Sequence, residues 1–286
     1  MSTLSKRGRK LVAFGRSGLL ADEFLHRFFR GYMRSLAPNP NIAGETTSSR
    51  RINELVKCME SCERYLEIGV QHGVTLEGIE VNERWGVDPD PLFSLRKLPI
   101  GTHVQTMTSD DFFETIRNDT TQFDVIFIDG LHEWKQTYRD LYNAFDKLKP
   151  NGVVLLDDVV PTDEFSALPD FSESLAQRRA AGLSGEFWHG DVWKCITVIN
   201  EHVPALQWRV IDPKFGNPQA LLWRKNSNES VEFPTIEALG SEYENLDYKT
   251  AFRGGDTIPS YFNVVDEQTA IRDYCQSLQM RSWTEH

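Results

Sequence analysis

Two apolar segments that end abruptly in acidic residues constrain the fold of this chain most strongly. Val125–Ile128 and Val153–Leu156 are continuous apolar runs, which is typical of parallel strands buried on both faces. Asp129 follows the first run, and Asp157 and Asp158 follow the second. Because the carboxyl ends of neighbouring parallel strands line one crevice where ligands bind, the pattern predicts an open α/β sheet with an acidic site at one edge.

A histidine accompanies these acids. His132 lies three positions after Asp129. Carboxylate oxygens suit Mg²⁺, and histidine is the side chain that titrates near neutral pH. The set therefore predicts a divalent-cation site on Asp129, Asp157 and Asp158 with His132 as a general base. The alternative is that Asp157 caps a loop, Asp158 is solvated and His132 caps the helix that starts at Glu133.

A glycine-bearing turn upstream indicates a second ligand at the same edge. Tyr65–Ile68 is strand-like and runs into a turn that contains Gly69 and Gly73, which let the backbone turn sharply and approach a ligand closely. The spacing is not the Gly-x-Gly-x-x-Gly of dinucleotide binders. Asp88 ends the next strand-like stretch, where a carboxylate can accept hydrogen bonds from ribose hydroxyls. Together these features predict a nucleoside site without a diphosphate cradle.

Four motifs in this order carry a family resemblance. They are Glu67-x-Gly69-x-x-x-Gly73-x-Thr75, Gly86-Val87-Asp88-Pro89, Ile128-Asp129-Gly130-x-His132 and Leu148-x-Pro150-x-Gly152-x-x-x-x-Asp157-Asp158. The chain resembles class I S-adenosylmethionine-dependent methyltransferases, and within them the metal-dependent O-methyltransferases that act on sugar hydroxyls of natural products and polysaccharides. Asn151 stands where the family pattern has a second glycine, and asparagine tolerates the left-handed conformation that such a turn uses.

The resemblance implies a role for each matching residue. It implies S-adenosylmethionine as cofactor, with Mg²⁺ or another divalent cation on the three acids, and catalytic roles for His132 and Asp129. The expected cofactor-binding residues are Glu67, Gly69, Gly73, Thr75, Asp88, Ser109, Asp110 and Asp129. Asp110 is equally suited to cap a helix. His72, His189 and Asp191 are weaker candidates, the last two for contact with substrate.

Charge and cysteine usage exclude several classes of partner. The net charge of −11 argues against nucleic acid, which rewards clustered Lys and Arg. No apolar stretch approaches the roughly 20 residues that cross a bilayer. The four cysteines form no disulfide-scaffold pattern, so we expect Cys58 and Cys62 to be free thiols in a reducing cytoplasm. These observations agree with a cytoplasmic enzyme. The resemblance implies a small-molecule or saccharide acceptor, and homo-oligomerisation is left open.

Alternating helix and strand patterns predict the domain organisation. The predicted fold is a Rossmann-like, doubly wound sheet, mostly parallel with an antiparallel strand at one edge, and with helical appendages at both termini. Residues 1–49 are expected to form a helical segment or lid that ends in a linker, and residues 50–225 the methyltransferase domain. Residues 159–190 read as a lid or substrate loop, because long loops at a catalytic edge are usually functional. Residues 226–286 read as an appendage with one helix near its end.

The sequence predicts a Mg²⁺-dependent O-methyltransferase that methylates a hydroxyl, expected on a sugar or a glycosylated metabolite. Two alternatives stay open: a metal-independent small-molecule methyltransferase of the same fold, and a catalytically silent cofactor-binding scaffold.

Overall fold

The computed structural model describes residues 45–185, 187–253 and 257–282. The helix predicted for the N-terminal segment lies outside the described residues. A helix begins at Thr47, so the prediction that the segment over residues 1–49 ends in a linker is wrong for its last residues. Thr46 caps this helix, accepting a hydrogen bond from the Ser49 amide while the Ser49 side chain accepts one from the Thr46 amide.

An eight-stranded sheet forms the centre of the molecule, in the order β3-β2-β1-β4-β5-β7-β6-β8. Adjacent strands are parallel except at β7, which is antiparallel to both neighbours. The predicted sheet, mostly parallel with an antiparallel strand towards one edge, is confirmed. The antiparallel strand is β7, and β6 and β8 lie beyond it. The strands are β1 (Arg64–Ile68), β2 (Glu83–Val87), β3 (Thr102–Gln105), β4 (Phe123–Ile128), β5 (Leu148–Leu156), β6 (Leu206–Ile211), β7 (Ala220–Arg224) and β8 (Val264–Val265).

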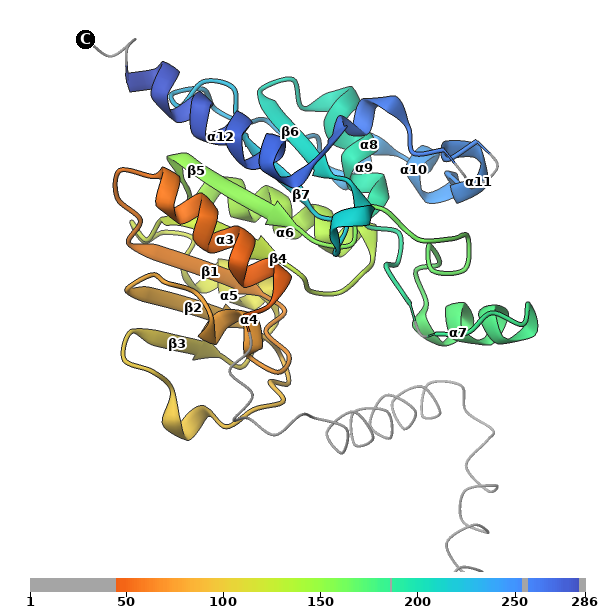
Figure 1. The fold of residues 1–286 in the computed structure, drawn as a ribbon, viewed down its shortest axis with the longest axis horizontal. Helices are drawn as coiled ribbons and strands as arrows, with labels where there is room; N and C mark the ends of the chain where they lie inside the picture. The colour runs from red at the N-terminus through yellow and green to blue at the C-terminus, as the bar shows by residue number, and fades with distance from the viewer. Residues whose placement is uncertain (1–44, 186, 254–256, 283–286) are drawn as a thin grey trace, which may run out of the picture. The chain divides into compact units, whose positions relative to one another are not determined.

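Helices cover both faces of the sheet, because its central strands are apolar on both sides. Along β4, Ile126 and Ile128 join one core cluster while Val125 and Phe127 join the other. Figure 1 shows α3 and α12 in front of the sheet and α6 behind it. The α-helices are α3 (Thr47–Cys58), α4 (Val74–Glu77), α5 (Ser109–Thr115), α6 (Trp134–Lys147), α7 (Phe171–Ala180), α8 (Trp193–His202), α9 (Ile236–Leu239), α10 (Glu242–Asn245), α11 (Tyr248–Ala251) and α12 (Glu267–Ser282).

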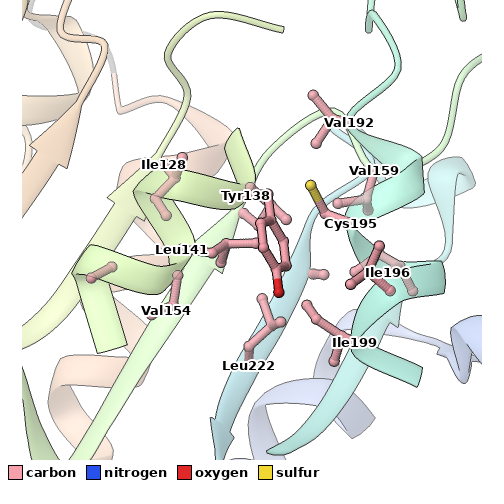
Figure 2. Packing of buried hydrophobic residues seen from close by; sticks show 14 of the residues in the cluster. Ile128, Tyr138, Leu141, Val154, Val159, Val192, Cys195, Ile196, Ile199 and Leu222 are labelled. Atoms are coloured by element: carbon pink, nitrogen blue, oxygen red, sulfur yellow. The ribbon is translucent and has the colours of Figure 1, made fainter. Parts of the chain in front are cut away.

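The contact between α6 and α8 fixes the helix that follows the candidate base. Tyr138 and Leu141 of α6 lie against Ile196 and Ile199 of α8, above the apolar strands (Figure 2). These side chains are at most 2% exposed. The periodic apolar side chains of α6 therefore form the face that packs on the sheet and on α8.

The C-terminal residues are joined to the core at several points. β8 pairs with β6, α12 packs on α3, and the described residues fall in one compact unit. The predicted boundary near residue 225 stays a prediction. None of the helices in the described ranges is long and apolar enough to cross a membrane.

A disulfide joins α3 to α12. Cys58 is bonded to Cys275, with their Cα atoms 5.4 Å apart, so the expected free thiol at Cys58 is wrong. Cys62 and Cys195 are free. Sequence reasoning missed the bond because nothing local to Cys58 indicates that α12 packs beside it.

We expect reduction of this disulfide to lower the free energy of unfolding by about 2–5 kcal/mol, because the bond closes a very long loop in the unfolded chain. Thermal melts with and without dithiothreitol measure the effect. The double variant Cys58→Ser/Cys275→Ser should melt at the lower temperature in both conditions. Cys62→Ser, which removes a half-buried free thiol from the same region, should keep the full response. An unchanged melting temperature of the wild type in reductant would contradict the prediction.

Candidate functional site

The glycine turn after β1 brings the ends of three strands together. The Gly69 amide donates to the carbonyl of Val87 at 2.8 Å, where β2 ends. Gly69 has a φ of +88°, and a methyl group on its Cα would lie 1.9 Å from the carbonyl oxygen of Asp129, where β4 ends. Only glycine fits this position. Gly73 has a φ of +73° and starts α4 beside the Phe93 ring.

Asp88 is held against this turn by backbone donors. Its two carboxylate oxygens accept hydrogen bonds from the amides of Gln71 and Asp90, each at 2.8 Å. Gln71 itself has a positive φ of 44°. The carboxylate therefore lies next to the glycine turn, as the predicted contact with ribose hydroxyls requires.

Two further predicted cofactor residues are occupied by protein contacts. Glu67 is buried, and its carboxylate accepts a hydrogen bond from the Tyr65 hydroxyl at 2.7 Å. Burial raises the pKa of Glu67 well above its usual range, and the nearby charge of Asp129 adds to this. The Thr75 hydroxyl lies 3.1 Å from that of Thr46 at the start of α3. The roles of Glu67 and Thr75 toward the cofactor stay predictions.

Ser109 and Asp110 open α5, as expected, but the helix is capped by Thr108, whose hydroxyl accepts from the Asp111 amide at 3.1 Å. The Gln136 side chain of α6 donates to both Ser109 and Asp110 at 3.2 Å.

Sequence reasoning missed the acid beneath this pair. Gln136 also donates to Asp140 at 3.1 Å, and Asp140 is only 1% exposed. Burial raises the pKa of Asp140 to about 7. The sequence offers one hint of this buried acid, which is that Asp140 directly precedes Leu141 on the apolar side of the helix.

The acids and the histidine converge at the carboxyl ends of β4 and β5. His132 Nε2 lies 3.0 Å from Asp158 Oδ2 and 3.5 Å from Asp129 Oδ1. One potential ligand atom from each of these three residues lies within 4.8 Å of the others, the only such group of acidic, histidine and cysteine side chains in the described ranges. The structure therefore brings Asp129, His132 and Asp158 together, as the sequence predicts.

Asp157 occupies a different position from its neighbour. It is 5% exposed, and its Oδ1 accepts from the Asp158 amide at 2.9 Å while its Oδ2 accepts from Gln219 at 3.0 Å. Asp158 has a positive φ of 61°, a conformation that costs an ordinary residue free energy and that clusters at functional sites. Asp157 thus braces the turn that presents Asp158, and its role as a third cation ligand stays a prediction.

Withdrawal from solvent and mutual repulsion raise the pKa values of all three acids. Asp129 and Asp158 reach about 6 and Asp157 about 7. Burial lowers the pKa of His132, but the charges of Asp158 and Asp129 outweigh it and raise the value to about 9. His132 therefore carries a proton at neutral pH while nothing else offsets these carboxylates.

The segment at the end of the loop over residues 159–190 holds His132 in place. Its ring stacks on Trp188, with centroids 4.7 Å apart and planes inclined by 25°. The Asp191 amide donates to the carbonyl of His132 at 3.2 Å. Gly190 has a φ of +60°, and a methyl group there would lie 1.7 Å from the same carbonyl oxygen. This close approach fixes the backbone of the candidate base.

Asp191 has a structural role that the sequence did not reveal. Its carboxylate accepts from the Trp134 amide at 2.7 Å, at the start of α6, and pairs with Lys194 at 3.0 Å. Asp191 is 4% exposed, so its carboxylate caps a helix rather than facing open solvent. His132 does not cap α6.

The imidazole of His189 is 3.9 Å from Asp158, and burial lowers its pKa to about 4, so it is neutral there.

These residues fit a divalent cation. Two carboxylates and an imidazole converge, and the acids are held close enough together that their ionised forms repel, which a cation would relieve. The Nδ1 atom of His132 is buried without a hydrogen-bond partner among the described residues. The hard oxygen donors favour Mg²⁺ or a similar ion.

Comparison with known proteins identifies the core. Residues 66–159 match a family described as a methyltransferase domain. The matched stretch runs from β1 through the end of β5 and so contains the glycine turn, Asp88 and the acid–histidine cluster. Residues 66–159 thus resemble a methyltransferase domain in sequence. The match supports the predicted methyltransferase resemblance for this part of the chain. No curated protein matches the chain in sequence.

Several solved structures are similar to this chain. Cofactor-bound Rv0187 from MTB is 16% identical, covering 74% of this chain and 92% of that one, with a TM-score of 0.45. A putative O-methyltransferase from Klebsiella pneumoniae is 14% identical, covering 76% and 94%, with a TM-score of 0.46. MycE methyltransferase of the mycinamycin pathway, in complex with Mg, SAH and mycinamycin VI, is 16% identical, covering 65% and 50%, with a TM-score of 0.40.

Proposed function

We propose that this chain is an O-methyltransferase that depends on Mg²⁺ or another divalent cation and transfers the methyl group of S-adenosylmethionine to an acceptor hydroxyl. The observation that carries the proposal is the convergence of Asp129, His132 and Asp158 directly beside the glycine turn. The Asp129 carbonyl touches Gly69 and its carboxylate faces His132, so cofactor and cation would be held by adjacent groups.

The chemistry needs both a charge and a base. An alcohol is a poor nucleophile toward a sulfonium methyl group until it loses its proton. A divalent cation held by Asp129 and Asp158, with Asp157 as the third predicted ligand, would stabilise the developing alkoxide and orient it. His132 takes the proton. Its Nε2 already faces the acids that would hold the cation, so the acceptor oxygen and the base are brought together.

The protonation state of His132 follows from its neighbours. The carboxylates of Asp158 and Asp129 raise its pKa to about 9. Positive charge placed between these carboxylates offsets them, which lowers the pKa of His132 toward its ordinary value and frees it to act as a base. Trp188 and the Gly190 turn keep its ring and backbone in one orientation meanwhile.

For the acceptor, we propose only a chemical class. The family resemblance favours a sugar hydroxyl or a glycosylated metabolite, and the loop over residues 159–190 is the surface beside the site that would contact it. Homo-oligomerisation stays open. A cytoplasmic location stays a prediction, and the disulfide weighs against it because such bonds persist mainly in oxidising compartments.

Calorimetric titrations of the full chain test the proposal. We expect S-adenosylhomocysteine to bind in the micromolar range, and Mn²⁺ to bind the wild type but not Asp158→Asn, because the variant loses a ligand charge. Asp146→Asn, a change of the same kind at an exposed acid near the other end of α6, should bind Mn²⁺ normally. Methylation of hydroxylated acceptors should stop in EDTA and return with Mg²⁺. Turnover that EDTA leaves unchanged would rule out the cation and favour the metal-independent alternative.

A further inference from the structure

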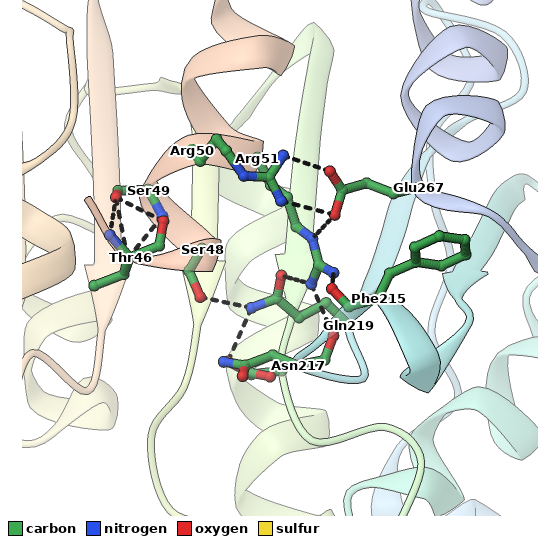
Figure 3. Close-up of polar contacts among 10 residues, drawn as sticks. Thr46, Ser48, Ser49, Arg50, Arg51, Phe215, Asn217, Gln219 and Glu267 are labelled. Carbon is green, nitrogen blue, oxygen red and sulfur yellow. Dashed lines mark hydrogen bonds and ion pairs between the residues drawn. The ribbon is translucent and has the colours of Figure 1, made fainter. Parts of the chain in front are cut away.

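A fully buried arginine and a buried glutamine connect Asp157 to both ends of the described chain. Gln219, at the start of β7, is 0% exposed and donates to Asp157 Oδ2 at 3.0 Å and to the Ser48 hydroxyl at 2.7 Å. Its carbonyl oxygen accepts from the Arg51 guanidinium at 2.8 Å. Figure 3 shows these contacts between α3, the β6–β7 connection and α12.

The orientation of the Gln219 amide is determined by its two charged neighbours. Arg51 can only donate hydrogen bonds, and an ionised Asp157 can only accept them. The amide oxygen must therefore face Arg51 and the NH₂ group must face Asp157. A flipped amide would place two acceptors, or two donors, against each other in a buried space, which costs free energy at both contacts.

Arg51 is itself fixed by partners on every side. Its Nε donates to Glu267 of α12 at 2.7 Å, and its remaining groups donate to the carbonyls of Asn217 at 2.7 Å and Phe215 at 3.0 Å. Glu267 also pairs with Arg50, whose side chain is 41% exposed while that of Arg51 is 0% exposed. Only the inner arginine reaches Gln219.

We propose that Gln219, oriented by Arg51 and Glu267, is a positioning residue that holds the Asp157 carboxylate against the left-handed Asp158 turn and so sets the affinity of the site for its divalent cation. The proposal rests on the cation dependence proposed above. Asp157 Oδ2 accepts from Gln219 at 3.0 Å and from the Asn217 side chain at the longer distance of 3.4 Å, while its Oδ1 accepts from the Asp158 amide. Losing the glutamine therefore removes the shorter of the two bonds to Oδ2 and loosens the carboxylate that holds the Asp158 turn. Groups that orient ligand residues in this way commonly change metal affinity when they are replaced.

The test is Gln219→Met, which keeps the length and volume of the side chain and removes its hydrogen bonds. Titrations of the full chain with Mn²⁺ and with S-adenosylhomocysteine give separate dissociation constants. We expect the constant for Mn²⁺ to rise about 10–100-fold, as for other residues behind a metal ligand. The constant for S-adenosylhomocysteine should stay within about twofold, because the hydrogen-bond partners of Gln219 are Arg51, Ser48 and Asp157, none of which is an expected cofactor residue. A conserved Mn²⁺ affinity in this variant would overturn the proposal.

Matched variants separate positioning from stability. Arg51→Lys keeps a cation beside Glu267 but cannot reach Glu267 and Gln219 together, so it should weaken Mn²⁺ binding in the same direction. Arg50→Gln removes the outer partner of the same glutamate and should leave Mn²⁺ binding unchanged. Equal effects of the two arginine variants would contradict the relay.

Two further results have distinct meanings. If Gln219→Met loses S-adenosylhomocysteine binding as well, the deciding variant is Gln219→Asn, which keeps a buried amide on a side chain one methylene shorter. Weaker Mn²⁺ binding by Gln219→Asn with normal cofactor binding supports the proposal. Normal binding of both ligands by this variant overturns it. If wild-type protein binds S-adenosylhomocysteine but no Mn²⁺, the proposed cation dependence fails and the positioning role fails with it.

Discussion

Replacing Gly69 by alanine is expected to abolish binding of S-adenosylmethionine and to destabilise the protein by several kcal/mol. The added methyl group would lie 1.9 Å from the carbonyl oxygen of Asp129, so β1 and β4 would have to separate where the cofactor turn meets the acid cluster. The φ of +88° adds a conformational cost of about 1–2 kcal/mol for any residue with a Cβ. Calorimetry with S-adenosylhomocysteine and chemical denaturation measure the two effects.

Gly182→Ala is the matched control for this change. Gly182 has a φ of +73°, but a methyl group there would meet nothing within 4 Å. Its alanine variant should pay only the conformational cost and bind the cofactor normally. If Gly69→Ala behaved like Gly182→Ala, the close approach of Gly69 to Asp129 would not be what makes the turn require glycine.

Replacing His132 by alanine is expected to lower kcat by about 10²–10⁴-fold, the usual contribution of a general base. Binding of S-adenosylhomocysteine should change little, because the ring faces Asp129 and Asp158 and stacks on Trp188. His103→Ala, which removes an exposed histidine from β3, should keep full activity. Full turnover by His132→Ala would remove this residue from the mechanism.

The pH dependence of this reaction should carry the signature of His132. The base acts without its proton, so the rate should rise with pH through the pKa of the imidazole and then level off. The carboxylates raise the pKa of His132 to about 9, and a cation between them lowers it. At saturating Mg²⁺, the midpoint of the increase in the wild-type rate should therefore lie below pH 9. The residual activity of His132→Ala should lack this rise.

Sequence reasoning succeeded where a local pattern determines the structure. The apolar runs that became β4 and β5 are long and end at acids, and parallel topology then brings Asp129 and Asp158 to one edge. Gly69 and Gly73 were recognised because sharp turns require glycine, and both have positive φ. For these features, residue type and spacing carry the structural information.

The failures concern contacts between segments far apart in the chain. The partner of Cys58 is 217 positions away, and Gln219 reaches Asp157 only because β7 inserts next to β5. β8 has two residues, too few for any periodicity. Asp191 was read as a substrate contact, but its carboxylate is used at the start of α6. No pattern within a single segment indicates such pairings.

The way the loop over residues 159–190 is anchored has a consequence for how substitutions could change the proposed acceptor preference. The loop is fastened near its beginning and its end, where the His189 amide donates to the Ser166 carbonyl at 2.9 Å and Asp191 binds the backbone around His132. α7 and the turn after it lie between these two attachments. Under the proposed function, substitutions there are expected to change the surface offered to an acceptor while His132 stays beside the acids. Variation in this segment is therefore expected to yield enzymes that differ in acceptor and share one chemistry.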